Sequence, residues 1–120
     1  MRRTLREARG KRVVLTPALE GVVVAVGDRW AALWCDRWVL VRVSSVVGLE
    51  VLHDEEAPAL PELVDLYDVR TVLFTASSLS PVLEVDDRSV EVFRIGDKKA
   101  HLVSGRPLRL KQVERVALAP

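Results

Sequence analysis

The sequence has few of the residues that usually build catalytic or metal sites. Its 120 residues include one cysteine and two histidines. The single cysteine, Cys35, excludes an internal disulfide and fits a reducing cytoplasm, where we expect the protein to reside. There is no glycine-rich phosphate loop, and Ser44-Ser45 and Thr75 to Ser78 lack the sequence context of an activated hydroxyl. We therefore expect a protein that is not an enzyme, with no catalytic residues and no cofactor.

The remaining candidates for chemistry have plainer interpretations. Cys35 precedes Asp36, whose carboxylate raises the pKa of a thiol rather than lowering it, so a structural thiol is favoured. His53 and the three acids that follow it are consecutive and cannot all face one metal ion. His101 stands alone among apolar neighbours. We therefore predict no metal site.

Long apolar runs and a strong excess of one charge are also missing. No run approaches the roughly 18 residues that a membrane helix needs, and no apolar segment of the signal-peptide type follows the basic N-terminus. We expect neither membrane insertion nor secretion. The formal net charge of +1 excludes a whole-molecule polyanion binder but leaves a local patch open. With 49% hydrophobic and 29% charged residues, the chain has a globular composition.

The stretch from Gly21 to Leu52 is rich in valine and is expected to organise the fold. Trp30, Trp34 and Trp38 lie four apart, which is helical spacing, but the flanking VVVAV and VLVRV alternate and are β-branched. The flanks favour strands. Gly27-Asp28 is expected to form a turn, with a second break at residues 35–37. This stretch predicts a small, curved, antiparallel sheet.

The flanking segments have simpler patterns. Residues 1–12 are predicted to be a basic, solvated arm, whose deletion over 1–10 would change the free energy of unfolding by about 1 kcal/mol or less. Residues 53–63 form an acidic and proline-containing break, followed by one helical turn at 64–68 and a strand at 70–74. Short strands separated by turn signals then continue to the end of the chain, which predicts an all-β fold.

A faint internal repeat supports two units. Val26-Gly27-Asp28 matches Ile95-Gly96-Asp97, Leu33 matches Leu102, and Val46 matches Val113. Because β-hairpins resemble one another for physical reasons alone, the sequence leaves two architectures open. Residues 13–120 form either one small antiparallel barrel or two related sub-barrels in tandem, at about 13–56 and 64–120.

Several of these segments resemble the CheW-type chemotaxis adaptor family. The similar residues are Val22 to Val26 with Gly27-Asp28, Cys35 to Val43, and Pro81 to Asp86, with a second start of the same unit at Val92 to Leu102. The chain lacks the family's Asn-hydrophobic-Arg-Gly turn and would be a reduced or divergent member. The resemblance implies a non-enzymatic adaptor or scaffold for chemosensory-type signalling, whose partners are a signalling kinase, a receptor or another scaffold.

Two kinds of partner surface follow from these readings. Three tryptophans in nine residues are hard to bury on one face of a small domain, so we predict a protein interface, or a homo-oligomer contact, at Trp30, Trp34, Trp38, Val39 and Val41. The alternative is a small SH3-like or Sm-like barrel that binds nucleic acid through its basic arm. In that case the contacts would be Arg2, Arg3, Arg6, Arg9, Lys11 and Arg12.

Overall fold

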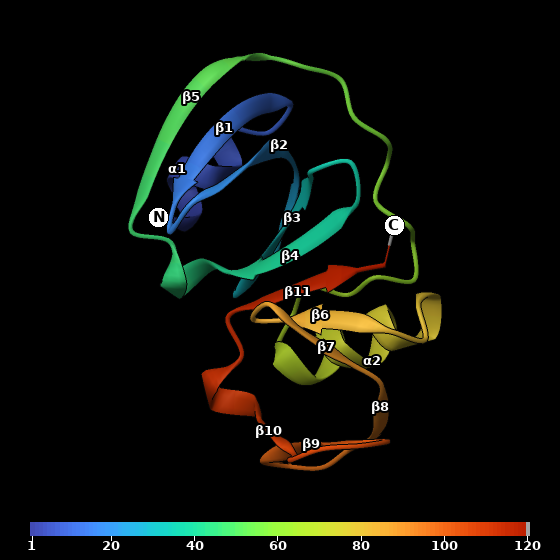
Figure 1. Ribbon diagram of the computed structural model, residues 1–120. Coiled ribbons are helices and arrows are strands. Elements are labelled where there is room, and N and C mark those ends of the chain that lie inside the picture. The colour runs from blue at the N-terminus through green and yellow to red at the C-terminus, as the bar shows by residue number, and fades with distance from the viewer. Residues whose placement is uncertain (120) are drawn as a thin grey trace.

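The computed structural model describes residues 1–119 and confirms a mainly β fold (Figure 1). An eight-stranded antiparallel sheet has the order β5-β1-β2-β3-β4-β11-β6-β7, and a three-stranded sheet has the order β10-β9-β8. The sheets are open, so the predicted barrels are only approximate. The elements are α1 (Arg2–Glu7), β1 (Lys11–Thr16), β2 (Leu19–Val26), β3 (Trp30–Trp34), β4 (Trp38–Arg42), η1 (Val43–Ser45), β5 (Gly48–Asp54), α2 (Val69–Leu79), β6 (Leu83–Val85), β7 (Arg88–Val90), β8 (Val92–Ile95), β9 (Lys99–Leu102), β10 (Leu108–Arg109), η2 (Leu110–Gln112) and β11 (Arg115–Leu118).

The elements occur twice in the same order. Unit 1, residues 2–54, has a helix, four strands, a 3-10 turn and a last strand that pairs back with the first. Unit 2, residues 69–118, repeats this order, with the counterpart of β2 divided into β7 and β8. The predicted boundary between sub-barrels falls in the connecting segment, residues 55–68. That the units descend from one duplicated sequence stays a prediction.

The agreement between the units extends to single hydrogen bonds. The Gly27 N–H donates to the carbonyl of Trp30, and the Gly96 N–H donates to the carbonyl of Lys99, each at 2.8 Å. The strand before each turn has its register shift at the equivalent place, between Val23 and Ala25 and between Val92 and Arg94. Each residue of unit 2 in these hairpins can therefore be compared with a counterpart 69 positions earlier in unit 1.

Strand β11 joins the two units, because it pairs with β6 of unit 2 and with β4 of unit 1. Alternate side chains along a strand point to opposite faces. Ala117 accordingly packs in the core of unit 1, whereas Val116 and Leu118 pack in the larger core that unit 2 shares with the outer face of β3 and β4. In Figure 1, β11 crosses the middle of the molecule, between the two units.

The connecting segment packs on unit 1. Val64 and Leu66 are buried against the outer face of β3 and β4, and Leu60 is partly buried there. A Cβ atom added at Gly27 would lie 2.8 Å from both the Cβ and the carbonyl oxygen of Leu66. The turn at Gly27 therefore needs glycine, because the connecting segment passes too close for any side chain.

The predicted strand at 70–74 is wrong, because these residues lie in helix α2. A reciprocal capping box starts the helix: the Asp68 carboxylate accepts from the Thr71 N–H at 2.9 Å, and the Thr71 hydroxyl accepts from the Asp68 N–H at 3.1 Å. Val72, Leu73 and Ala76 then lie on one face and are fully buried. Helical spacing and the cap outweigh the β propensity of the run TVLF.

The predicted solvated arm is also wrong. Residues 2–7 form helix α1, which buries Leu5 completely and leaves Ala8 2% exposed in the core of unit 1. The Gly10 N–H then donates to the carbonyl of Val23 at 2.9 Å. Two apolar residues three apart are enough to attach a single helical turn, although they are too few to show a period in the sequence.

Candidate functional site

The predicted tryptophan interface lies mostly in the core. Trp30 is fully buried and Trp38 is 9% exposed, while Val39 and Val41 are also buried. Strands β3 and β4 are central in the eight-stranded sheet and are covered on both faces, by the core of unit 1 and by the larger core. Only Trp34 is partly exposed, with its ring edge-on to that of Trp38 at 5.1 Å. The prediction of a partner surface at these residues is therefore corrected.

Arg42 and Trp30 form a structural contact at the junction between the two units. The Arg42 guanidinium lies 5.2 Å from the centre of the Trp30 ring and donates to the carbonyls of Val113, at 2.8 Å, and Leu110, at 3.0 Å. Those two carbonyls belong to η2 and the residue that follows it in unit 2. The Trp30–Arg42 pair thus holds the units together, and its charge is satisfied within the protein.

The candidate nucleophile and the histidines are not assembled into a reactive group. Burial raises the pKa of the Cys35 thiol to about 11, so the thiolate is disfavoured. His53 is exposed on β5 and His101 is half-buried on β9. The Ser45 hydroxyl donates to the carbonyl of Arg42 at 2.8 Å. In the described chain, no group of three or more His, Cys, Asp or Glu residues is placed to hold a metal ion.

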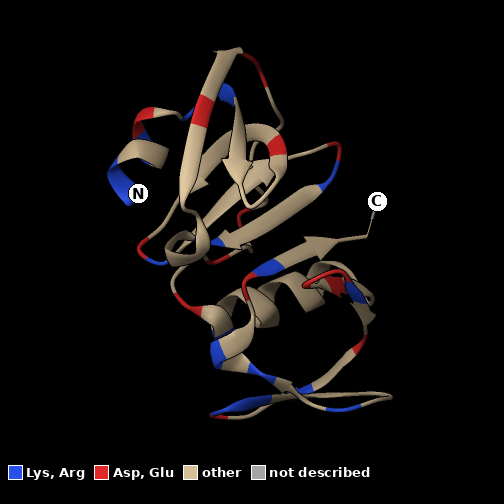
Figure 2. Ribbon diagram, turned by 60° about the vertical axis from the view of Figure 1, so that its left-hand side comes forward, with Lys and Arg blue, Asp and Glu red and all other residues tan. Residues whose placement is uncertain are grey.

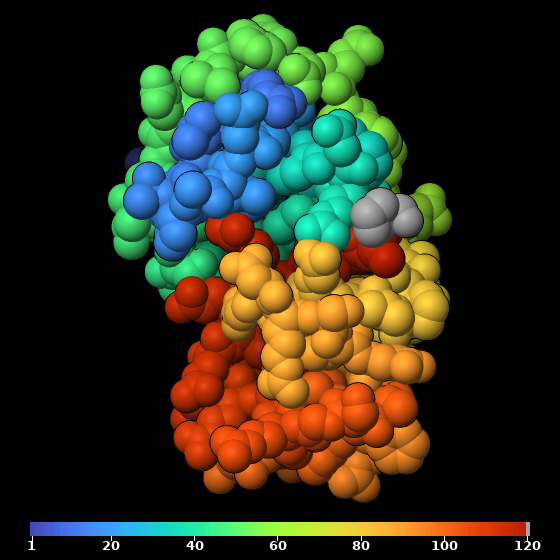
Figure 3. Space-filling model, in the orientation of Figure 1, coloured from blue at the N-terminus to red at the C-terminus, as the bar shows by residue number. Residues whose placement is uncertain are grey.

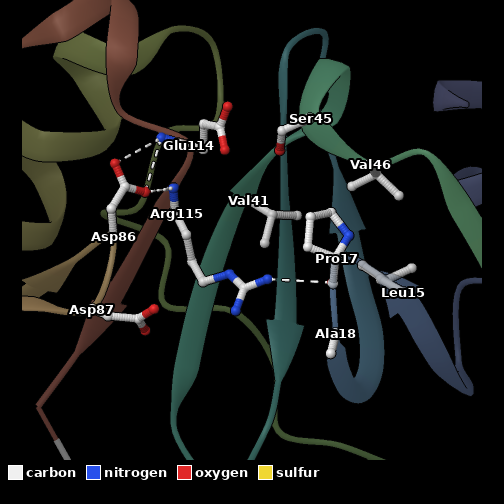
Figure 4. A pocket seen from close by; sticks show the side chains of 10 residues that line it. All are labelled: Leu15, Pro17, Ala18, Val41, Ser45, Val46, Asp86, Asp87, Glu114 and Arg115. Atoms are coloured by element: carbon white, nitrogen blue, oxygen red, sulfur yellow. Dashed lines mark hydrogen bonds between the residues drawn. The ribbon is translucent and has the colours of Figure 1, made fainter.

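A pocket of about 290 Å³ lies where the two units meet (Figure 4). Its polar wall comes from unit 2. The Asp86 carboxylate accepts from the N–H groups of Glu114, at 3.1 Å, and Arg115, at 2.9 Å, and the Arg115 guanidinium donates to the carbonyl of Pro17 at 3.5 Å. The opposite wall is largely apolar and includes Leu15 and Val41. Asp86 therefore holds the start of β11 within unit 2, and Arg115 reaches across to unit 1. The residues lining the pocket include no nucleophile paired with a base.

Much of the charge in the N-terminal basic segment is neutralised by neighbouring acids. Arg2 pairs with Asp28 at 3.2 Å, and Lys11 pairs with Asp54 at 2.9 Å. Arg12 bonds both Glu20, at 2.8 Å, and Glu55, at 2.9 Å. These pairs leave Arg3, Arg6 and Arg9 as the exposed cations of this segment for which the described residues supply no ion pair. Nucleic-acid contact through the segment stays a prediction, with half of its proposed cations already engaged.

The free edge of β5 is the first surface that the structure adds. β5 is seven residues long and stands at the end of the eight-stranded sheet, where within residues 1–119 it pairs only with β1. Apolar side chains on and beside it are exposed: Val47 by 75%, Val51 by 47% and Leu52 by 42%. Figure 3 shows this strand along the upper rim of the molecule. An edge strand of this length with exposed valine and leucine is a template for another strand.

The second surface is the outer face of the three-stranded sheet, called here the basic face. Register places Arg94 opposite His101 and Lys99 opposite Arg109, while Ile95, Ala100 and Leu108 form the inner row. Figure 2 shows lysine and arginine along these strands. The basic face consists of Phe93, Arg94, Lys99, His101, Val103 and Arg109, with Lys98, Arg106 and Lys111 at its margins.

Neither surface was predicted from the sequence, although the sequence contains a signal for one of them. Six of the 18 lysine and arginine residues, but one of the 17 acids, lie within residues 92–112, so this segment carries +5 while the rest of the chain carries −4. The near-neutral total hides that asymmetry. The free edge of β5 has no equivalent signal, because strand order depends on long-range pairing.

Comparisons with known proteins do not assign the chain to a family. No family model matches the chain, and neither the curated proteins nor the solved structures contain a match. Separately, none of the helices within residues 1–119 has the length and apolar character needed to cross a bilayer.

Proposed function

We propose that the chain is a non-catalytic protein-binding module whose contact element is the free edge of β5. The observation that carries this proposal is a difference between the two units. In unit 2, the last strand, β11, is paired along both edges, with β6 and with β4. Its counterpart in unit 1, β5, is paired with β1 alone among the strands that the structure describes. β5 therefore presents unpaired backbone groups at the edge where its counterpart has a neighbouring strand.

An extended segment of a partner protein fits this edge. Strand addition draws its affinity from backbone hydrogen bonds and its specificity from alternate side chains. Here Val51 and Leu52 are exposed next to the register shift between β1 and β5, so a docked strand would bury apolar surface at this point of the edge. Glu50, His53 and Asp54 interrupt the apolar surface and limit indiscriminate aggregation. A second copy of this chain is one protein able to supply such a strand.

The resemblance of residues 21–116 to CheW-type adaptors also supports a protein partner. On that resemblance, the partner is a signalling kinase, a receptor or a scaffold of chemosensory type. The predicted tryptophan interface is replaced by the β5 edge, since the tryptophans are occupied within the core. The adaptor function is retained as part of the proposal.

The experiment compares two lysine variants in affinity capture with the tagged full-length chain. Val51→Lys/Leu52→Lys places two positive charges on the edge strand, which blunts strand addition. Phe74→Lys is the control, because Phe74 is 65% exposed on helix α2 and lies outside the edge strand. The captured proteins are identified by mass spectrometry, and sedimentation velocity measures self-association of the same three proteins.

We expect a protein retained by the wild type and by Phe74→Lys but lost from the double variant, while circular dichroism remains unchanged. A self-associating wild type that becomes monomeric only in the double variant would identify a second copy as the partner. The proposal is wrong if the double variant retains every captured protein and the same sedimentation coefficient as the wild type.

A further inference from the structure

We propose that the basic face is a second binding surface and that it takes single-stranded nucleic acid. This inference is independent of the protein-binding function, because the basic face belongs to the three-stranded sheet and not to the β5 edge. Figure 3 shows residues 92–112 forming the lower end of the molecule, with β5 at the other end. Both ligands would then be held at once without sharing a surface.

The cations of the basic face form no ion pair with any acid that the structure describes. Arg94, Lys98, Lys99, Arg106, Arg109 and Lys111 are all exposed, and within residues 1–119 none of them has a carboxylate within 4 Å. The one acid of this segment, Asp97, pairs with Arg70 of helix α2 at 3.5 Å. The positive charge is therefore available to a ligand, unlike that of Arg2, Lys11 and Arg12.

The equivalent face of unit 1 is covered by other parts of the protein, and its residues can be compared with those of the basic face. The counterparts of Lys99, His101 and Val103 in unit 1 are Trp30, Ala32 and Trp34. Those residues pack under the connecting segment and helix α2. In unit 2, apart from the two neighbours in the chain, the Lys99 carbonyl is the one described group within 4 Å of a Cβ added at Gly96. The equivalent sheet face is thus apolar in unit 1, where the protein covers it, and basic in unit 2, where it is exposed.

One cross-strand pair also differs in charge between the two units. In unit 1, Trp30 lies opposite Arg42, and the two form a cation–π contact. The equivalent pair in unit 2 is Lys99 opposite Arg109. Two like charges directly opposite each other on a sheet destabilise the fold, and a bound anion between them removes that repulsion. This arrangement favours a ligand with negative charge at that position.

The exposed aromatic residue of the basic face, Phe93, indicates which class of polyanion the face would bind. Phe93 is 75% exposed and stands beside Arg94 on β8, and Val103, just after β9, is 60% exposed. An exposed ring among cations suits unpaired bases, which stack on aromatic side chains while lysine and arginine bind the phosphates. A duplex hides its base faces, and an acidic polypeptide offers no base to stack. Single-stranded nucleic acid therefore uses both features of the face.

The test measures fluorescence anisotropy of a labelled 20-nucleotide oligouridylate or oligothymidylate with the full-length chain. If four phosphates are contacted, the slope of log affinity against log salt is about −2.8 for a single strand, which gives about 50-fold weaker binding at 200 mM than at 50 mM salt. A 20-base-pair duplex and a labelled polyglutamate peptide serve as competing probes. We expect the single strand to bind more tightly than either.

Matched variants locate the surface. Lys99→Gln/Arg109→Gln removes two charges from the basic face, and Arg3→Gln/Arg6→Gln removes two exposed, unpaired charges from helix α1. Both doubles lower the net charge equally. We expect the first to reduce the steepness of the salt slope by about 1.4, with the second leaving it unchanged. Phe93→Ala should weaken single-strand binding about fivefold or more through lost stacking.

Several results would overturn the inference. One is the absence of single-strand binding at about 100 µM protein and 50 mM salt, the weak end of non-specific affinity. A second is an equal loss in the two double variants, which would mean that net charge alone is responsible. A third is equal affinity for duplex or polyglutamate with no effect of Phe93→Ala, which would assign the face to phosphates or acidic proteins in general.

Discussion

Leu5 provides the sharpest test of how the N-terminal segment contributes to the fold. The side chain is fully buried with Val13, Leu15 and Val23, on a helix of only six residues. Leu5→Ala removes apolar surface and leaves a cavity, and such changes in cores typically cost 2–5 kcal/mol. Because a terminal helix can detach locally and limit the loss, we expect about 2–3 kcal/mol here.

This loss is large relative to the whole protein. At roughly 0.05–0.15 kcal/mol per residue, a chain of 120 residues has a free energy of unfolding of about 6–18 kcal/mol. Deletion of residues 1–10 also removes Ala8 and the bond from the Gly10 N–H to Val23, and it should therefore cost at least as much as Leu5→Ala. The arm predicted from the sequence would have cost about 1 kcal/mol or less.

The assay is urea unfolding followed by tryptophan fluorescence and by far-ultraviolet circular dichroism. Arg6→Ala is the control, since Arg6 is exposed on the same helix and its loss should change stability by about 0.5 kcal/mol or less. The expected result is a lower midpoint for Leu5→Ala with an unchanged denaturant slope, in both signals. A loss below about 1 kcal/mol would refute the assignment of α1 to the core.

Three further predictions concern single residues. Gly27→Ala should lower the urea midpoint clearly, because its methyl group would lie 2.8 Å from Leu66 of the connecting segment. Gly96→Ala, whose methyl group would have its nearest contact at 3.3 Å, should lower the midpoint less. Equal effects of the two variants would contradict the packing of the connecting segment against Gly27. Cys35 should react with a thiol reagent about 10- to 100-fold more slowly in the native protein than in guanidinium, because burial raises the pKa of its thiol from 9.0 to about 11. Equal rates in the two conditions would contradict the burial of Cys35. The hydrogen bond from Arg37 lowers the pKa of Glu84 below 4.5, so its contribution to stability is present above that pH and is lost as the pH falls through the lower, folded-state value. The urea midpoint of Glu84→Gln should therefore fall less on acidification from pH 6 to pH 3 than that of the wild type, and an identical pH profile would count against the pair.

Local patterns in the sequence were sufficient for the strands of the tryptophan stretch and for two turns. The tryptophan stretch was correctly predicted as two strands, β3 and β4, because β-branched flanks outweigh a four-residue spacing. The turns at Gly27-Asp28 and Gly96-Asp97 are where their residues predict them. These features depend on neighbours within a few positions, which the sequence displays directly.

The helices were missed for two different reasons. Helix α2 had a readable signal, the Asp68–Thr71 capping box followed by Val72, Leu73 and Ala76 at helical spacing, but the run TVLF was interpreted as a strand. Helix α1 has only Leu5 and Ala8 to show, which is too little for a period. Its formation depends on a core that residues distant in sequence supply.

The candidate sites were decided by tertiary structure. Whether Trp30 is core or surface depends on the connecting segment, residues 55–68, and on helix α2, which begins at Val69. Burial under these later segments provides the free energy that keeps Trp30 in the core. The charges of residues 92–112 are visible in the sequence, but their gathering on one open face depends on the bulge and register of β8 and β9. The free edge of β5 depends on where β11 inserts, between β4 and β6. The sequence alone shows the concentration of positive charge in residues 92–112, and long-range strand pairing determines which surfaces and edges meet solvent.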